Sequence, residues 1–120
     1  MSQIESSWKF AEELVTESDA IAWARQHSLE VGVEAVSPAV GAQLAVVVAA
    51  SNASSIIEVG TGLGVSGLWM LSGAPGATLT TIDREIEHQQ TARDAYLQAG
   101  VARAVQRRRA LRADRHVELF

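Results

Sequence analysis

Two acidic residues stand alone in a long uncharged stretch of this sequence. Between Glu34 and Arg84, only Glu58 and Asp83 carry a formal charge, and each ends a short run rich in β-branched residues. In an open α/β sheet, ligands bind outside the carboxyl ends of the parallel strands. If the two runs are strands, both carboxylates lie at that edge, and they are the first candidates for a binding site.

A glycine-rich segment, Gly-Thr-Gly-Leu-Gly over residues 60–64, follows almost directly after Glu58. Glycines allow a sharp turn and let a ligand approach the backbone, because no Cβ is in the way. Ser66 then opens a helix, whose free N–H groups and dipole suit a carboxylate or phosphate. Asp83 is placed to accept hydrogen bonds from two vicinal ribose hydroxyls. The combination predicts a site for an adenosine-type ligand.

The residues around the glycines narrow the choice of that ligand. Dehydrogenases use Gly-x-Gly-x-x-Gly, in which the third glycine permits close packing of helix on strand, but Val65 stands at that position here. Glu58 would lie poorly beside a pyrophosphate, whereas it could meet the ammonium group of a zwitterionic ligand. These two residues favour S-adenosylmethionine over a dinucleotide.

The elements that must position these residues alternate along the chain. Caps are provided by Ser18 before the second helix, by Ser37 and Pro38 at the start of the third, and by Gly100 after the last. Such alternation is typical of an α/β fold with a parallel sheet and flanking helices. We expect helices over residues 8–15, 19–27, 37–50, 66–72 and 85–98, and strands over residues 54–59 and 78–83.

The uncharged stretch also has a membrane interpretation, because residues 35–57 exceed the roughly 20 residues that cross a bilayer. A buried parallel strand with covering helices gives the same apolar pattern. Several residues in the stretch argue against a membrane span and favour the buried interpretation. They are Pro38, Gly41, Gln43, Ser51, Asn52, Ser54 and Ser55.

Composition limits the remaining possibilities. A chain of 120 residues is at most one domain. The absence of cysteine excludes disulfides, thiolate metal sites and thiol nucleophiles, and it fits a reducing cytoplasm. The first residues lack the basic and apolar regions of a signal peptide, so we expect neither secretion nor a membrane partner.

The last twenty residues are a different kind of sequence. Residues 1–100 hold 4 basic and 12 acidic side chains, whereas residues 101–120 hold 6 and 2. Residues 101–120 contain no β-branched run and no glycine or proline, which predicts a basic helix. A nucleic-acid patch is a weakly supported alternative on an otherwise acidic domain. Our hypothesis is that the gene is truncated or frame-shifted near residue 101, so that residues 1–100 are the N-terminal part of a binding domain.

Four segments together resemble the bacterial class I O-methyltransferases related to catechol O-methyltransferase, over about residues 8 to 100. They are Val36-Ser-Pro-Ala-Val-Gly41, Glu58-Val-Gly-Thr-Gly-Leu-Gly-Val-Ser-Gly-Leu-Trp69, Leu79-Thr-Thr-Ile-Asp83 and Glu87-His-Gln89. The resemblance implies a Rossmann-like fold that is truncated after its second strand–helix unit, and methyl transfer from S-adenosylmethionine to the hydroxyl of a small, catechol-like molecule.

The resemblance also implies residue roles. Arg84, beside the ribose acid, would face the adenine. A divalent, Mg-like cation would hold the substrate hydroxyls, although its ligands would lie on strands that this chain lacks. No catalytic residue can be named. The candidate cofactor-binding residues are Val36, Glu58, Gly60, Thr61, Gly62, Gly64, Ser66, Asp83 and Arg84.

Plainer interpretations remain open at several of these positions. Glu58 could be a strand-end acid in a salt bridge, and Asp83 could cap the helix that follows it. Thr61 and Ser66 could satisfy loop backbone groups. For Trp8, Trp23 and Trp69, core or interface packing is favoured over a substrate cage, and the three histidines show no ligand spacing.

The alternative function is a noncatalytic adenosine-ligand module or interaction fragment. A truncated sheet would leave apolar faces uncovered, so we also expect poor solubility or dependence on a partner, such as a homodimer.

Overall fold

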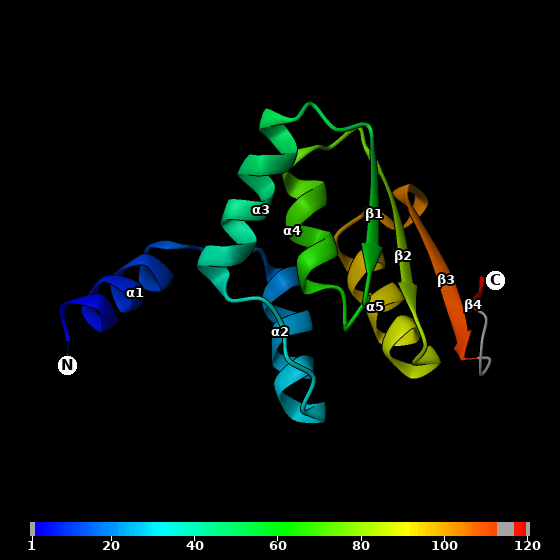
Figure 1. Cartoon of the computed structure of the whole chain (residues 1–120), viewed down its shortest axis with the longest axis horizontal. Coiled ribbons are helices and arrows are strands. Elements are labelled where there is room, and N and C mark those ends of the chain that lie inside the picture. The colour runs from blue at the N-terminus through cyan, green and yellow to red at the C-terminus, as the bar shows by residue number, and fades with distance from the viewer. Residues whose placement is uncertain (1, 113–116, 120) are drawn as a thin grey trace.

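A computed structural model describes residues 2–112 and 117–119 of the chain, and these residues alternate between helices and strands (Figure 1). The elements are α1 (Gln3–Leu14), α2 (Asp19–Val31), α3 (Pro38–Ala50), β1 (Ser55–Val59), α4 (Val65–Gly73), β2 (Thr78–Asp83), α5 (Ile86–Gln98), the 3-10 turn η1 (Ala102–Ala104), β3 (Val105–Arg112) and β4 (Val117–Leu119). All seven elements expected from the sequence are present. Their ends differ most in α1, which begins five residues earlier, at Gln3.

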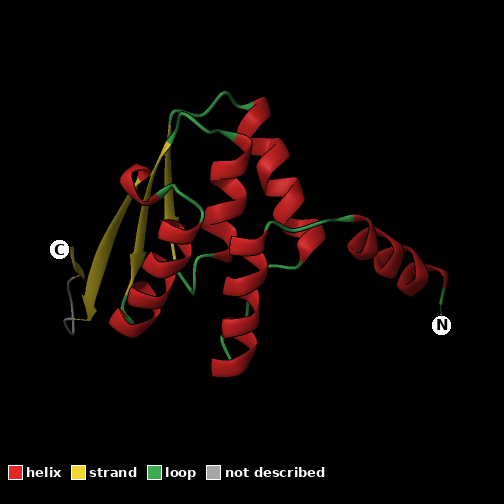
Figure 2. Ribbon diagram, turned by 180° about the vertical axis from the view of Figure 1, so that it is seen from behind, coloured by secondary structure: helices red, strands yellow, loops and turns green. Residues whose placement is uncertain are grey.

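The strands form one sheet in the order β1-β2-β3-β4. β1 pairs with β2, and β2 with β3, in parallel, whereas β4 is antiparallel to β3. The helices gather on one side of this sheet (Figure 2). The predicted α/β, Rossmann-like architecture is therefore confirmed. Because β1 and β2 run in parallel, their carboxyl ends, and with them Glu58 and Asp83, lie at the same edge.

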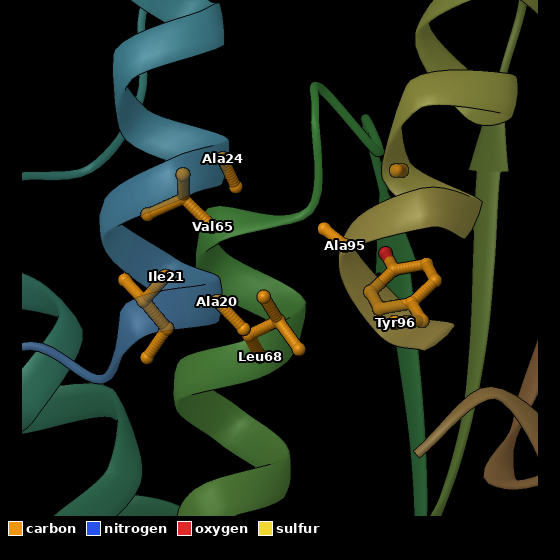
Figure 3. Close-up of a cluster of buried hydrophobic side chains, with 8 residues drawn as sticks. Ala20, Ile21, Ala24, Val65, Leu68, Ala95 and Tyr96 are labelled. Atoms are coloured by element: carbon orange, nitrogen blue, oxygen red, sulfur yellow. The ribbon is translucent and has the colours of Figure 1, made fainter. Parts of the chain in front are cut away.

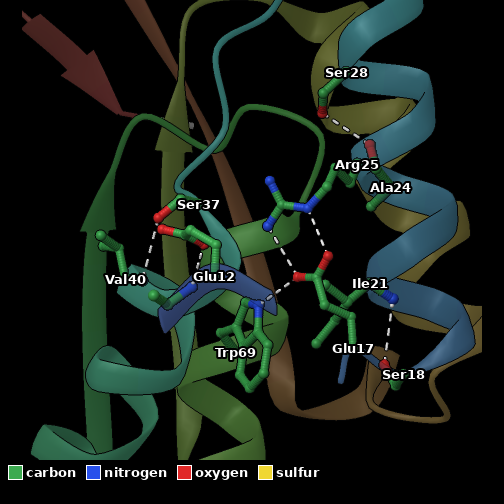
Figure 4. A network of polar contacts seen from close by, with 11 residues as sticks. Glu12, Glu17, Ser18, Ile21, Ala24, Arg25, Ser28, Ser37, Val40 and Trp69 are labelled. Carbon is green, nitrogen blue, oxygen red and sulfur yellow. Dashed lines mark hydrogen bonds and ion pairs between the residues drawn. The ribbon is translucent and has the colours of Figure 1, made fainter. Parts of the chain in front are cut away.

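The predicted helix starts are confirmed at Ser18 and Ser37. Their side-chain oxygens accept hydrogen bonds from the backbone N–H groups of Ile21 and Val40, both at 3.3 Å (Figure 4). Pro38 occupies the first turn of α3, where its missing N–H has no cost. Caps of this kind are worth about 1 kcal/mol each, so they fix where α2 and α3 begin.

The prediction of a basic helix after Gly100 is wrong over the described residues, because residues 105–112 form a third parallel strand. Gln89, buried on α5, joins this arginine-rich strand to the helix layer. The side-chain Nε2 of Gln89 donates to the backbone oxygen of Arg108 at 2.6 Å. The backbone oxygen of Gln89 accepts from the guanidinium of Arg107 at 3.2 Å. Residues 113–116 and 120 lie outside the described residues, and the frame-shift hypothesis remains a hypothesis.

The core consists of two clusters of buried side chains. The first joins α2, α4 and α5, and its many alanines let the helices approach closely (Figure 3). The second joins α3, α4, β1 and β2 and contains Val48, Ile56, Leu71, Ala77 and Leu79. Trp23 and Trp69 pack at the margin of the first cluster, as expected, whereas Trp8 is 61% exposed on α1.

None of the described helices is long and apolar enough to cross a membrane.

The outer side of β1 is an uncovered sheet edge. Ile57 and Val59 are 72% and 84% exposed, and β2 is the one strand paired with β1 among the described residues. An apolar strand edge with unpaired backbone groups is a template for pairing with another chain. The structure therefore provides a physical basis for the expected self-association.

We expect Ile57→Lys to reduce self-association without lowering the melting temperature, because a lysine on an open edge opposes strand pairing and removes no core contact. Sedimentation velocity measures the effect. Val31→Lys is the matched control, since Val31 is 60% exposed at the end of α2, outside the sheet. Equal association of both variants and the parent chain would rule out β1 as the associating edge.

Candidate cofactor-binding site

A cavity of about 320 Å³ opens at the carboxyl ends of β1 and β2. Six of the nine predicted residues line it, namely Val36, Gly60, Thr61, Gly62, Ser66 and Asp83. The structure thus brings together residues from the α2–α3 connection, the glycine loop, α4 and the end of β2. Three predicted residues do not line the cavity, namely Gly64, Glu58 and Arg84. Their positions are described one by one below.

The glycine loop adopts the backbone conformation that its sequence predicts. Gly60, Gly62 and Gly64 have φ angles of +96°, +54° and +100°, in the left-handed region that favours glycine. Gly64 also lies against α5, since an added Cβ would be 3.3 Å from the Tyr96 ring. It therefore fits the loop to the helix behind it, while Gly60 and Gly62 face the cavity.

Asp83 connects the glycine loop to the start of α5. Its Oδ2 accepts a hydrogen bond from the backbone N–H of Gly62 at 3.1 Å, and its Oδ1 accepts from Glu85 at 2.9 Å. The helix-cap interpretation of Asp83 is wrong, because the cap residue of α5 is Glu85 and no side chain of the described residues caps this helix. Asp83 instead accepts from the residue before α5, and the same carboxylate holds the loop. A carboxylate has about four acceptor positions, so it keeps capacity for two ribose hydroxyls. That ribose role stays a prediction.

Glu58 lies beneath the loop in a chain of polar side chains. Its Oε1 accepts a hydrogen bond from Thr81 Oγ1 at 2.8 Å, and its Oε2 accepts from Ser66. Thr61 Oγ1 and Thr81 Oγ1 are also 2.8 Å apart. The salt-bridge interpretation of Glu58 is wrong among the described residues, where this carboxylate has hydroxyl partners and no ion pair.

Burial raises the pKa of the Glu58 carboxyl, while the hydrogen bonds from Ser66 and Thr81 act in the opposite direction. The negative charge of Asp83 raises this pKa further. Ser66 separates Glu58 from the cavity, so the carboxylate acts on a ligand through its charge and through Ser66. Direct contact of Glu58 with an ammonium group stays a prediction.

Arg84 is exposed and lies outside the cavity lining, so its proposed contact with adenine remains a prediction.

Sequence reasoning missed Thr81 and His88. Thr81 is fully buried, and its register opposite Glu58 puts both side chains on the covered face of the sheet. Thr81 lies two residues before Asp83, so in a strand both side chains point to the same face. That spacing could have indicated Thr81 from the sequence. His88 lines the cavity from the first turn of α5. The position of His88 shortly after Asp83, in the first turn of the next helix, could have indicated that it lies at the cavity. Its spacing from other residues does not indicate a metal ligand. The cavity lining includes seven residues that were not predicted: Ser28, Val33, Glu34, Ala35, Leu63, Val65 and His88.

The wall that contains Val36 is held in place by contacts behind it (Figure 4). Trp69 packs on Gly41, where an added Cβ would lie only 2.2 Å from the indole Cδ1. The indole N–H of Trp69 donates to Glu17 at 2.8 Å, and Arg25 donates to the same carboxylate at 2.6 and 2.9 Å. The Gly41 contact fixes α3 against α4, and the Glu17 contacts fix the start of α2 against α4. The Val36 segment lies between α2 and α3.

The described residues contain no group of three or more histidine, cysteine or acidic side chains that could hold a metal ion. They therefore do not fit the divalent cation that the sequence resemblance implies, and no chemical step is assigned to such an ion here.

Comparison with known proteins gives a consistent result. A family model described as O-methyltransferase matches residues 11–115. A curated relative from Mycobacterium sp. (strain JLS), whose name refers to the same activity, is 46% identical over 101 residues, which are 83% of this chain and 46% of the relative. A relative from Mycolicibacterium vanbaalenii is 48% identical over 82% of this chain and 44% of its own length.

Solved structures agree. The O-methyltransferase TomG from Streptomyces achromogenes, in complex with SAM, superimposes with a TM-score of 0.78 at 30% identity, over 89% of this chain and 51% of that protein. The O-methyltransferase from Bacillus cereus, in complex with SAH, gives a TM-score of 0.73 at 27% identity, over 82% and 46%. The chain spans about half the length of the relatives it matches.

Thr81→Val should lower the free energy of unfolding by about 1–3 kcal/mol, because it leaves the Glu58 carboxylate and the Thr61 hydroxyl without a shared partner. Urea unfolding measures this. Thr80→Val is the matched control on the opposite face of β2, and it should change stability by about 0.5 kcal/mol or less. Equal losses for both variants would contradict the assigned network.

The raised pKa of Glu58 predicts a pH dependence of stability. The unfolded carboxyl has its usual pKa of about 4.3, so ionisation of Glu58 costs folding free energy as the pH rises through the higher pKa of the folded state. Glu58→Gln is neutral throughout. The stability of this variant relative to the parent chain should therefore increase as the pH rises above about 4.3, and the increase should end once the pH exceeds the raised pKa of the folded state, as urea unfolding at each pH would measure. Parallel stability curves would contradict the raised pKa.

Proposed function

Because the chain belongs to the O-methyltransferase family, we propose that its glycine loop and Asp83 bind S-adenosylmethionine as the donor for methylation of a hydroxyl group. The observation that carries this proposal is the cavity at the carboxyl ends of β1 and β2, where Asp83 meets the glycine loop. The ribose would bind Asp83. The amino-acid end of the donor would lie near Ser66 and the start of α4.

The charge of the cavity supports this ligand. Glu34 and Asp83 line it, Glu58 lies behind Ser66, and neither lysine nor arginine is among its lining residues. S-adenosylmethionine carries a positive sulfonium and an ammonium group, which such carboxylates stabilise. The two negative charges of a pyrophosphate would be repelled. The same argument disfavours NAD, in agreement with Val65 at the position of the third dehydrogenase glycine.

In the proposed reaction, the methyl carbon moves from the sulfonium to a hydroxyl oxygen. The C–O bond forms as the C–S bond breaks, the hydroxyl proton passes to a base, and the sulfonium becomes a neutral thioether. The described residues hold and orient the donor for such an in-line displacement. The acceptor, which we propose to be a small catechol-like molecule, has no identified contact among them.

A noncatalytic adenosine-ligand module is the second candidate. It is favoured by the fact that the described residues form a donor cavity without a recognisable acceptor site or base. Binding of S-adenosylmethionine without methylation of catechols would support this candidate, whereas methylation would exclude it.

Calorimetric titration tests the proposed ligand. S-adenosylmethionine should bind, and Asp83→Asn should weaken it by about 10- to 100-fold, because the ribose loses hydrogen bonds to a charged acceptor. Glu85→Gln is the matched control, since Glu85 is an exposed acid two residues away. Binding of NAD with no binding of S-adenosylmethionine would overturn the proposal.

A further inference from the structure

Glu34 is an acid of the cavity whose carboxylate is not engaged by the fold. It lies in the connection between α2 and α3 and lines the cavity together with Asp83. The Asp83 carboxylate already accepts hydrogen bonds from the backbone N–H groups of Gly62 and Glu85. In the described part of the chain, the Glu34 side chain has neither a hydrogen-bond partner nor an ion-pair partner. Its charge is therefore available to a ligand.

The backbone that carries Glu34 is held at both ends. Gly32 ends α2 in the left-handed conformation, with φ +71°, and the backbone N–H of Val33 donates back into the last turns of α2 at 2.9 Å. At the other end, Ser37 caps α3. Only three residues connect these two fixed points. Glu34 is thus part of a defined cavity wall, although its side chain is exposed.

The position of this wall matches one particular group of the proposed donor. The ribose is assigned to Asp83 and the amino-acid end to the region of Ser66. The sulfonium sulfur is bonded to both parts, so it lies between these two points. The wall approaches the glycine loop here, since Val33 Cγ1 would lie 3.8 Å from a Cβ added to Gly62. Glu34 is the next residue, and it is the one further acid among the described residues that line the cavity.

We propose that Glu34 is a specificity-determining residue, whose carboxylate attracts the sulfonium and makes the cavity prefer S-adenosylmethionine over S-adenosylhomocysteine. Methyl transfer converts the sulfonium to a neutral thioether and leaves the adenosine, ammonium and carboxylate groups unchanged. The attraction therefore acts before the transfer and is lost in the product. No bond to Glu34 forms or breaks. The inference rests on the proposed function and names how the same site distinguishes donor from product.

The expected effect is modest, because water weakens the attraction between exposed charges. Pairs of this kind change an affinity by about 2- to 5-fold. Asp83 and Glu58 add negative charge near the cavity, so part of the preference for the donor should remain when Glu34 is neutral. The ratio of the two affinities isolates the sulfonium, since both ligands carry the same ammonium group.

Calorimetric titration with both ligands tests the proposal. We expect Glu34→Gln to weaken S-adenosylmethionine by about 2- to 5-fold relative to S-adenosylhomocysteine. Glu30→Gln is the matched control, since it makes the same change in net charge. Glu30 is an exposed acid of α2 one helical turn earlier, and it does not line the cavity. The control should leave the ratio of the two affinities unchanged.

Two further measurements show whether charge is the cause. Raising NaCl from about 0.05 M to about 0.5 M should lower the donor preference of the parent chain, because salt screens exposed charges. The preference should fall less in Glu34→Gln. Sinefungin carries a protonated amine on the carbon that replaces the sulfonium, so it keeps the positive charge. It should respond to Glu34→Gln as S-adenosylmethionine does.

The outcomes separate the possible failures. An unchanged ratio of affinities in Glu34→Gln, or an equal change in Glu30→Gln, would overturn the role of Glu34 and leave the donor site in place. Sinefungin behaving like S-adenosylhomocysteine, or a preference insensitive to salt, would overturn the role of its charge. If the parent chain binds neither S-adenosylmethionine nor S-adenosylhomocysteine, the proposed function fails and the assignment of Glu34 fails with it.

Discussion

The candidate site depends on the half-buried carboxylate of Glu58, because a charge that is partly withdrawn from water must be hydrogen-bonded. The parallel register of β1 and β2 places Thr81 opposite Glu58 on the covered face of the sheet. Ser66 reaches the same carboxylate from α4, and Thr61 extends the chain of hydroxyls into the glycine loop. The strand pairing, the first turn of α4 and the loop are therefore fixed together. A shift of β1 by one residue would turn Glu58 to the open face and break all three connections.

Asp83 provides the second link between the fold and the cavity. Its carboxylate accepts from the Gly62 amide on one side and from the Glu85 amide, just before α5, on the other, so it links the loop to the entry of that helix. The left-handed conformation of Gly62 makes this approach possible. A ligand that binds Asp83 would thus meet a loop that is already arranged, which lowers the entropic cost of binding.

The sequence predicts the parts of this architecture that follow from local rules, and it fails where a tertiary contact decides. The glycine conformations, the serine caps and the two strands ending in acids all arise from residues adjacent in the chain. The third strand does not, because three consecutive arginines hide its alternation, and its contacts with Gln89 of α5 join residues far apart in the chain. Thr81 and His88 were missed for the same reason. Each becomes part of the site only when the sheet register or the position of α5 is known.

In the proposed function, binding of the methyl donor and transfer of the methyl group are physically separable. Recognition of the donor requires the ends of β1 and β2, the loop between them and the helices that support it, and all of these lie within the described residues. The uncovered face of β1 offers few polar groups for an acceptor site, since its exposed side chains are Ser55, Ile57 and Val59. The proposed donor site can therefore be preorganised by the contacts of Glu58 and Asp83 alone.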